Sequence, residues 1–257
     1  MRKAALLFCF FAASLCGIAA AQTVNVSVTP LVSEMHVPSG QTGRTSTQVT
    51  NDGDADERIS IEPVDWTTNQ NGAIQLERPG SEGAHSLTKY LQALSYRFIL
   101  RPHETRRVEV ALTMPPSQAA ESYWGGFIIK SQPLGGNLAI GPAATFFVYD
   151  DVGSPRRHVS VASVHQVRVA GTRSVRMTVR LYNDGSAYAR TAGTLVISKD
   201  GKTVSEQRLA IGAILPGHAR LVTSVISGLP SGTYAARVVF DYGGEVIVGA
   251  DTSVAIP

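Results

Sequence analysis

Apolar and polar residues alternate along most of the chain, in short runs that end at glycine, proline, asparagine or aspartate. Three of the clearest runs are "TSTQVTN" (45–51), "RRVEVALTM" (106–114) and "VRMTVRLYN" (175–183). Alternation with a period of two is typical of a β-strand with one buried face. At 87–94, leucines and a tyrosine instead repeat at helical intervals after Ser86, a residue suited to an N-cap. We therefore expect a β-rich chain whose only notable helix lies at 87–94.

The alternating runs recur in the same order in two halves of the chain. Asn-Asp-Gly follows a strand at 51–53 and again at 183–185, and "ILRPHETRRVEVAL" (99–112) is similar to "AILPGHARLVTSVI" (213–226). Repeated units of about 100 residues built from short strands indicate immunoglobulin-like β-sandwiches. The expected fold class is all-β, with two immunoglobulin-like β-sandwich domains in tandem. The N-terminal domain is predicted at 22–150, a linker at 151–157 and the C-terminal domain at 158–257.

The first 21 residues have the features of a signal peptide. "MRK" supplies a charged start, an apolar run follows, and Ala19 to Ala21 have the small-residue pattern of a cleavage site. Residues 1–21 are therefore expected to be removed during export, with the periplasm as the expected destination. No later stretch has the length and apolarity of a membrane span, so no span is expected after cleavage. The only two cysteines, Cys9 and Cys16, lie in this segment, so disulfides and thiol chemistry are not expected in the mature chain.

Charge and motifs argue against several classes of function. Arg2 and Lys3 carry two of the three net positive charges, which leaves too little excess charge to suggest a nucleic-acid partner. The chain has no G-x-S-x-G elbow, phosphate-binding glycine loop or dinucleotide fingerprint. Its six histidines include no pair at the spacing of a zinc helix. We therefore expect a protein that is not an enzyme and that has neither a metal site nor a cofactor.

Several motifs of the first half resemble known families. "VSVTP", the "DW" at 65–66, "YRFILRPHETRRVEV" and the "MPP" turn resemble the N-terminal domain of the periplasmic pilus-assembly (fimbrial) chaperones. "LRPHETRRVEVALTMPP" and "YWGGF" are also similar to the first domain of the WxL-interacting, peptidoglycan-binding-like surface proteins. Both families have two immunoglobulin-like domains, so the resemblance supports the same fold. The second half shares only generic features with them.

The segment "GGNLAIGPAATFFVYDD" (135–151) reads as a strand that is apolar on both faces. Such a strand needs two covers. One cover is the core of its own sandwich, and the other is either the second domain or a partner strand, as the chaperone resemblance implies. The predicted partner-binding face is Leu138, Ile140, Ala144, Phe146 and Val148.

The pilus chaperones carry two basic residues in their cleft that bind a terminal carboxylate. The resemblance places the corresponding positions at Met35 and at about Phe146, where this chain has no charge. Arg156 and Arg157, in the predicted linker, are candidates to supply it and count as partner-binding residues. The alternative is that both arginines are simply solvated.

Two functions follow as expectations. The first is a non-enzymatic periplasmic chaperone-like protein that binds exported pilus or fimbrial subunits by β-strand addition, in fimbrium biogenesis. Its partner would be a pilin-like subunit, with an outer-membrane usher as a further candidate. The alternative is a cell-envelope surface module that binds glycan or another wall component, with Trp124 beside two glycines as a sugar-stacking candidate. A core position is the other interpretation of Trp124.

Overall fold

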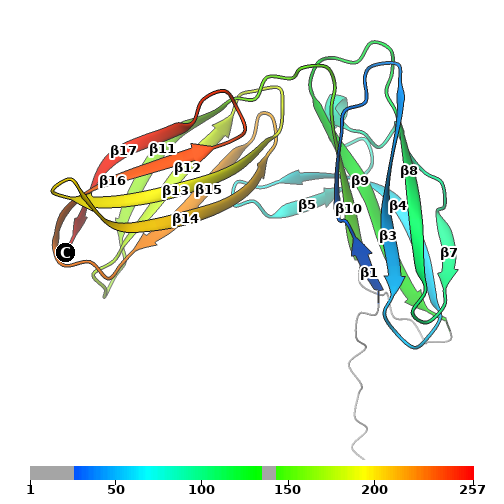
Figure 1. The fold of residues 1–257 in the computed structure, drawn as a ribbon, viewed down its shortest axis with the longest axis horizontal. Helices are drawn as coiled ribbons and strands as arrows, with labels where there is room; N and C mark the ends of the chain where they lie inside the picture. The colour runs from blue at the N-terminus through cyan, green and yellow to red at the C-terminus, as the bar shows by residue number, and fades with distance from the viewer. Residues whose placement is uncertain (1–25, 135–142) are drawn as a thin grey trace, which may run out of the picture.

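The computed structural model describes residues 26–134 and 143–257, so the predicted signal peptide lies outside the described residues. The chain forms two β-sandwiches in tandem, joined by an extended segment and set at a bend (Figure 1). The first contains strands β1 to β10 and the second strands β11 to β17. The predicted fold class is therefore confirmed.

In the first sandwich, one sheet has the strand order β1-β3-β8-β6 and the other the order β2-β10-β9-β4-β5, with β7 also paired to β4. The strands are β1 (Val26–Thr29), β2 (Val32–Met35), β3 (Thr42–Asn51), β4 (Glu57–Thr68), β5 (Ile74–Glu77), β6 (Leu91–Ala93), β7 (Arg97–Leu100), β8 (Thr105–Thr113), β9 (Ser122–Pro133) and β10 (Ala143–Asp151).

In the second sandwich, a three-stranded sheet has the order β11-β12-β15 and a four-stranded sheet the order β14-β13-β16-β17. All pairings within these two sheets are antiparallel. The strands are β11 (Val159–Arg168), β12 (Val175–Asn183), β13 (Ala189–Lys199), β14 (Lys202–Ile214), β15 (Ala219–Ile226), β16 (Gly232–Asp241) and β17 (Val248–Ile256).

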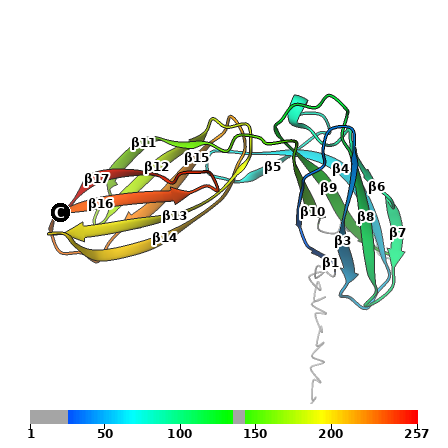
Figure 2. The same ribbon diagram turned by 45° about the horizontal axis from the view of Figure 1, so that its top comes forward.

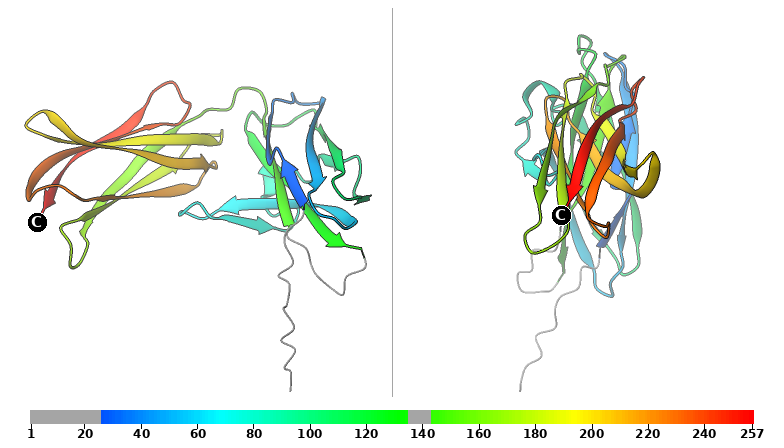
Figure 3. Two further views of the ribbon diagram at one scale, coloured as in Figure 1. Left: turned by 60° about the horizontal axis from the view of Figure 1, so that its bottom comes forward. Right: turned by 90° about the vertical axis from the view of Figure 1, so that its left-hand side faces the viewer.

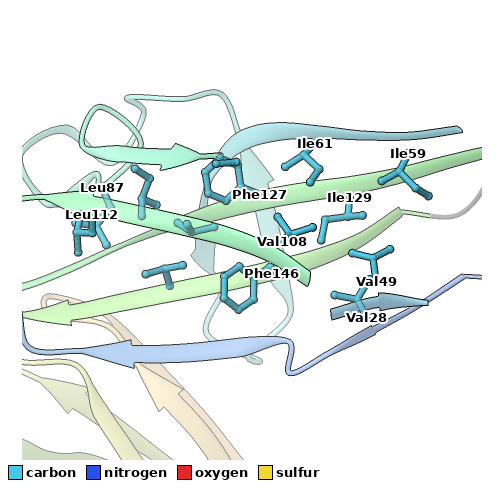
Figure 4. Packing of buried hydrophobic residues seen from close by; sticks show 14 of the residues in the cluster. Val28, Val49, Ile59, Ile61, Leu87, Val108, Leu112, Phe127, Ile129 and Phe146 are labelled. Atoms are coloured by element: carbon cyan, nitrogen blue, oxygen red, sulfur yellow. The ribbon is translucent and has the colours of Figure 1, made fainter. Parts of the chain in front are cut away.

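Each sandwich has its own apolar core between its two sheets, because alternate residues of facing strands point inward. Figure 4 shows Phe127, Ile129 and Phe146 in the first core together with Val49 and Val108. The second core is built mainly from β12, β13, β14 and β16 in the same way. The binary pattern along the sequence therefore corresponds to real inward and outward faces.

The internal repeat is visible in two matching asparagine turns. Asn51 donates from Nδ2 to the carbonyl four residues later, at 2.7 Å, and Asn183 does the same at 2.9 Å. In both turns the asparagine Oδ1 accepts from the backbone N–H of the glycine two residues on, at 3.0 Å. Both asparagines are fully buried. The repeated Asn-Asp-Gly sequence thus marks a repeated turn that secures the end of a strand.

A second matching feature is a tyrosine near the start of a strand. The Tyr123 hydroxyl donates to the Ala119 carbonyl at 3.0 Å, and the Tyr234 hydroxyl donates to the Pro230 carbonyl at 2.8 Å. Both bonds reach back four residues, which is the geometry of the tyrosine corner of immunoglobulin-like folds.

The prediction of a helix at 87–94 is wrong. Leu91 donates to the Leu87 carbonyl at 3.0 Å, which makes a single turn, and the chain then enters β6. Ser86 does not cap a helix, because its hydroxyl donates to the buried carboxylate of Asp65 at 2.8 Å. A 3₁₀ turn at Gly83–His85 precedes this segment. Pairing of β6 with β8 buries Leu91 and Ala93 more effectively than an isolated short helix would.

Within the described ranges, no helix has the length and apolarity needed to cross a membrane.

Candidate functional site

Strand β10 is the centre of the candidate site because it carries the apolar stretch singled out in the sequence. It pairs antiparallel with β9 along its whole described length, from Ala143 opposite Lys130 to Asp151 opposite Ser122. The two strands approach closely at Gly126, where an added Cβ would lie 2.2 Å from the Phe146 carbonyl oxygen. Gly126 is therefore required for the register of β9 and β10.

Among the described residues, only half of the opposite edge of β10 is paired. Strand β2 pairs with it in parallel, but only along Phe147–Asp150. The Phe147 N–H donates to the Leu31 carbonyl at 2.8 Å, so the backbone groups of Thr145, two residues earlier, point to the same side. Within the described part of the chain, no strand pairs with the Ala143–Phe146 segment on that side. Leu31 is 47% exposed and immediately precedes β2, at the point where the pairing of β2 with β10 stops.

One face of β10 belongs to the first core. Phe146 and Val148 are 1% and 0% exposed and lie within the cluster shown in Figure 4, with Ala144 packed at its margin. Of the predicted partner-binding residues, Leu138 and Ile140 lie outside the described residues. Contact of Phe146 and Val148 with a partner stays a prediction, but here these two side chains are core residues.

The other face of β10 is covered by Trp66 of β4 together with residues of the second sandwich. The Trp66 ring meets Phe147 and Tyr149 edge to face, at centroid distances of 5.1 and 5.3 Å, and Tyr149 lies 4.4 Å from Tyr188 of the second domain. Leu215 of the second domain completes this junction cluster. Burial raises the pKa of Tyr149 to about 12 and also raises that of Tyr188. Aromatic packing of this kind fixes the two domains against each other.

Polar contacts reinforce the junction. The Ser122 N–H donates to the Ser186 carbonyl at 2.8 Å, and the Tyr188 N–H donates to Ser122 Oγ at 2.9 Å. Glu34 of β2 forms an ion pair with Arg190 of β13. The two hydrogen bonds of the buried Ser122 are directional, so they constrain the relative position of the domains more strongly than the exposed ion pair does.

The hairpin formed by β4 and β5 makes a further bridge between the domains. It projects from the first sandwich toward the second, as Figures 2 and 3 show. Thr67 Oγ1 lies 3.0 Å from His218 Nε2, and the Leu221 N–H donates to the Gln70 carbonyl at 2.6 Å. The hairpin therefore joins the domains in addition to the connecting chain, the junction cluster and the polar contacts of Ser122 and Glu34.

Asp150 is a buried carboxylate next to the β2 contact. It is 0% exposed, and its Oδ1 accepts the Val37 N–H at 2.8 Å. Its Oδ2 has no hydrogen-bond partner among the described residues. Burial raises the pKa of Asp150 to about 6, although the Val37 bond acts in the opposite direction.

The residues proposed for the cleft charge do not form one cationic cluster. Met35 is half-buried against the first core, opposite Asp150 in the β2–β10 pairing. Arg157 forms an ion pair with the buried Asp151, and Arg156 Nη2 donates to the Asp184 carbonyl at 2.5 Å. Both arginines therefore have partners within this chain, and their contact with another protein stays a prediction.

Trp124 is a core residue. Only 1% of it is exposed, its Nε1 donates to the Trp66 carbonyl at 3.0 Å, and His85 stacks on it at 4.8 Å. It therefore presents no ring face on which a sugar could stack. Across the described ranges, no cluster of three or more His, Cys, Asp or Glu side chains is arranged to hold a metal ion.

The sequence interpretation missed the residues of the second domain that complete the junction. Tyr188, Arg190 and Leu215 lie in or beside strands whose alternation shows only which residues face inward. One usable signal was the pair of large aromatic side chains on the outer face of β10, Phe147 and Tyr149. These side chains indicate that another part of the protein buries this face, but they do not indicate which part.

Comparison with known proteins gives one match to a family model. Residues 34–131 match the family described as "WxL Interacting Protein, peptidoglycan binding domain". None of the curated proteins compared with the sequence matches it.

Solved structures similar to this chain include fimbrial chaperones. The class 5 fimbriae chaperone CfaA is 12% identical, with a TM-score of 0.47 over 91% of this chain and 100% of that chain. The YadV chaperone is 13% identical, with a TM-score of 0.49 over 90% and 100%. The CsuC–CsuE chaperone–tip subunit complex of Acinetobacter baumannii is 11% identical, with a TM-score of 0.48 over 88% and 97%. Both resemblances that the sequence indicated are thus found again.

Proposed function

We propose that this protein is a non-enzymatic, chaperone-like binder that accepts a strand of an exported partner protein beside β10. The observation that carries the proposal is the backbone edge at Ala143–Phe146, next to β2, with which no strand of the described residues pairs on that side. Backbone groups on an open edge pair readily with an extended segment of another chain. The exposed Leu31 beside this edge offers an apolar contact for the added strand.

The biological setting is part of the same proposal. The predicted signal peptide supports export, and the resemblance to fimbrial chaperones supports a periplasmic location and a pilin-like subunit as the partner. An outer-membrane usher is the further partner that such a role would involve.

A proline at the open edge tests the proposal. Thr145→Pro removes an N–H that points to the open side, while the bonds of β10 to β9 use the groups of the neighbouring residues. Thr145→Val is the matched control, because it changes the side chain and keeps the N–H. The parent and each variant are purified separately, and each is then used to recover binding partners from an extract of the host's cell envelope. Mass spectrometry then identifies the proteins retained.

We expect the parent and Thr145→Val to retain the same exported protein, and Thr145→Pro to lose it by about tenfold or more. Urea denaturation checks that the proline variant is folded. A folded Thr145→Pro protein that retains the partner as the parent does would refute strand addition at this edge.

A second candidate function, binding to a wall component, is favoured by the match of residues 34–131 to a peptidoglycan-binding domain. Because Trp124 is buried, the binding surface would have to lie elsewhere on the first domain. Co-sedimentation with purified peptidoglycan separates the two proposals. Wall binding predicts that the parent and Thr145→Pro sediment equally, whereas strand addition predicts that neither does.

A further inference from the structure

Strands β11, β12 and β15 form a sheet of the second sandwich (Figure 2), and none of them contains aspartate, glutamate or lysine. Arg176 and Arg180 of β12 are exposed. Because Met177 and Val179 between them are buried, the two arginines share the outer face of the sheet. None of the ion pairs among the described residues includes either arginine. The positive charges of this face therefore have no counter-charge on their own sheet.

The first sandwich contains the equivalent sheet, and there the charges are compensated. Arg44 of β3 corresponds to Arg176 of β12, because each lies seven residues before the asparagine of its repeated turn. On the outer face of the first sheet, Glu109 of β8 forms an ion pair with Arg44 at 3.7 Å and with Arg107 at 4.0 Å. The internal repeat thus supplies a comparison within one chain, in which a glutamate lies between two arginines.

Thr223 takes the place of Glu109 in the second sheet. Glu109 lies opposite Ser46 in the pairing of β3 with β8, and Thr223 lies opposite Thr178 in the pairing of β12 with β15. Ser46 and Thr178 are equivalent, because each lies five residues before its asparagine turn. The hydroxyl oxygens of Thr178 and Thr223 are 3.3 Å apart. Neutral hydroxyl groups therefore occupy the position at which the first sheet has a carboxylate.

Apolar side chains flank Arg176 on both neighbouring strands. Its cross-strand partners are Val167 of β11 and Val225 of β15, which are 62% and 46% exposed. Protein–protein interfaces are enriched in arginine and depleted of lysine, aspartate and glutamate, and their centres are apolar. The composition of this surface is therefore that of a protein interface. We call it the arginine face, and it consists of Val167, Arg176, Thr178, Arg180, Thr223 and Val225.

We propose that the arginine face binds an acidic segment of another protein, with a partner carboxylate in the place that Glu109 has in the first sheet. Arg176 binds this carboxylate as Arg44 binds Glu109, because a guanidinium presents several N–H donors in one plane. Arg180 lies about 13 Å further along β12, so the face suits a segment with more than one carboxylate. The surface belongs to the second sandwich and does not depend on strand addition at β10.

Fluorescein-labelled poly-L-glutamate is a probe for this face, and fluorescence anisotropy measures its binding to the full mature protein at fixed ionic strength. Thr223→Glu supplies the missing carboxylate from the chain itself and should weaken binding about tenfold or more. Thr223→Gln has a side chain of the same size without the charge and should bind as the parent does. Melting temperatures check that the variants at this exposed position are folded.

A second control separates this face from the overall charge of the protein. Thr233→Glu makes the same change of net charge at an exposed position of β16, in the opposite sheet, and should bind as the parent does. Vesicles that contain phosphatidylglycerol, and inorganic polyphosphate, test a membrane or a phosphate polymer as the partner. Equal weakening by Thr223→Glu and Thr233→Glu would overturn the proposal, as would a parent that binds the vesicles or polyphosphate but not poly-L-glutamate.

Discussion

Ionisation of Asp150 should make the stability of this protein fall as the pH rises. The folded-state pKa of Asp150 is about 6, against an ordinary value of 3.8, because burial disfavours its charged form. A carboxyl group with a raised pKa binds its proton more tightly in the folded chain than in the unfolded chain. Its contribution to stability is therefore fully present below about pH 3.8 and is lost as the pH rises through about 6.

The size of the effect follows from the difference between the two pKa values. The difference is about 2, and each pKa unit corresponds to about 1.4 kcal/mol, so the ionised carboxylate costs about 3 kcal/mol above pH 6. Asp150 is 0% exposed, so solvent screens its charge only weakly. The cost falls on the segment where Val37 and β2 are attached to β10.

The variant Asp150→Asn isolates this cost. The amide cannot ionise, and its oxygen can still accept the Val37 N–H. The free energy of unfolding of both proteins is measured by urea denaturation between about pH 3.5 and about pH 7.5. We expect the parent to lose about 3 kcal/mol relative to Asp150→Asn across this range. Any cost of burying the amide donors is independent of pH and does not alter the slope.

Asp251→Asn provides a control of opposite sign. The Arg237 guanidinium donates to the exposed Asp251 at 2.7 Å and lowers its pKa. A lowered pKa stabilises the folded state above the ordinary pKa and loses that effect in acid, so the parent should gain relative to Asp251→Asn as the pH rises. A difference between the parent and Asp150→Asn that is constant with pH, or that has the same sign as this control, would refute the reasoning.

Three further substitutions test the packing around the site. Phe146→Glu places a charge in the first core and should lower the melting temperature sharply; a protein as stable as the parent would show that Phe146 is not a core residue. Asn183→Ala removes the donor to the carbonyls of Ala187 and Ile214 and should cost about 2 kcal/mol or more in urea denaturation, a result that an unchanged midpoint would contradict. Gly126→Val should separate β9 from β10 and reduce hydrogen-exchange protection in both strands, so unaltered protection would disprove the close approach.

The two-domain fold could be predicted because its signals are local. Alternation identifies the strands, and Asn51 and Asn183 mark the same turn because each makes its key bonds to residues two and four positions later. Tyr123 and Tyr234 likewise make bonds that reach back four residues. Because these interactions join residues that are close in sequence, each produces a short sequence pattern, and that pattern occurs once in each half of the chain.

The helix and the domain junction could not be predicted in this way. Leucines at 87–94 have helical spacing, but pairing of this segment with β8, from a later part of the chain, decides its structure. Trp66, Tyr149 and Tyr188 meet only after both sandwiches have formed. The outer face of β10 was recognisably apolar, yet alternation alone says nothing about which distant surface covers it.

The structure accounts for why one strand of this chain is apolar on both faces. Phe146 and Val148 pack into the first core, while Phe147 and Tyr149 pack against the junction cluster, so the second half of β10 is held from both sides and also by β2. The Ala143–Phe146 half is held by β9, and its other edge has no paired strand in the described part of the chain. For the proposed strand addition, this arrangement reduces the entropic cost of binding, because the accepting edge is already extended and fixed at its base. The second domain would then contribute to binding without touching the partner, by keeping β10 in the conformation that the added strand requires.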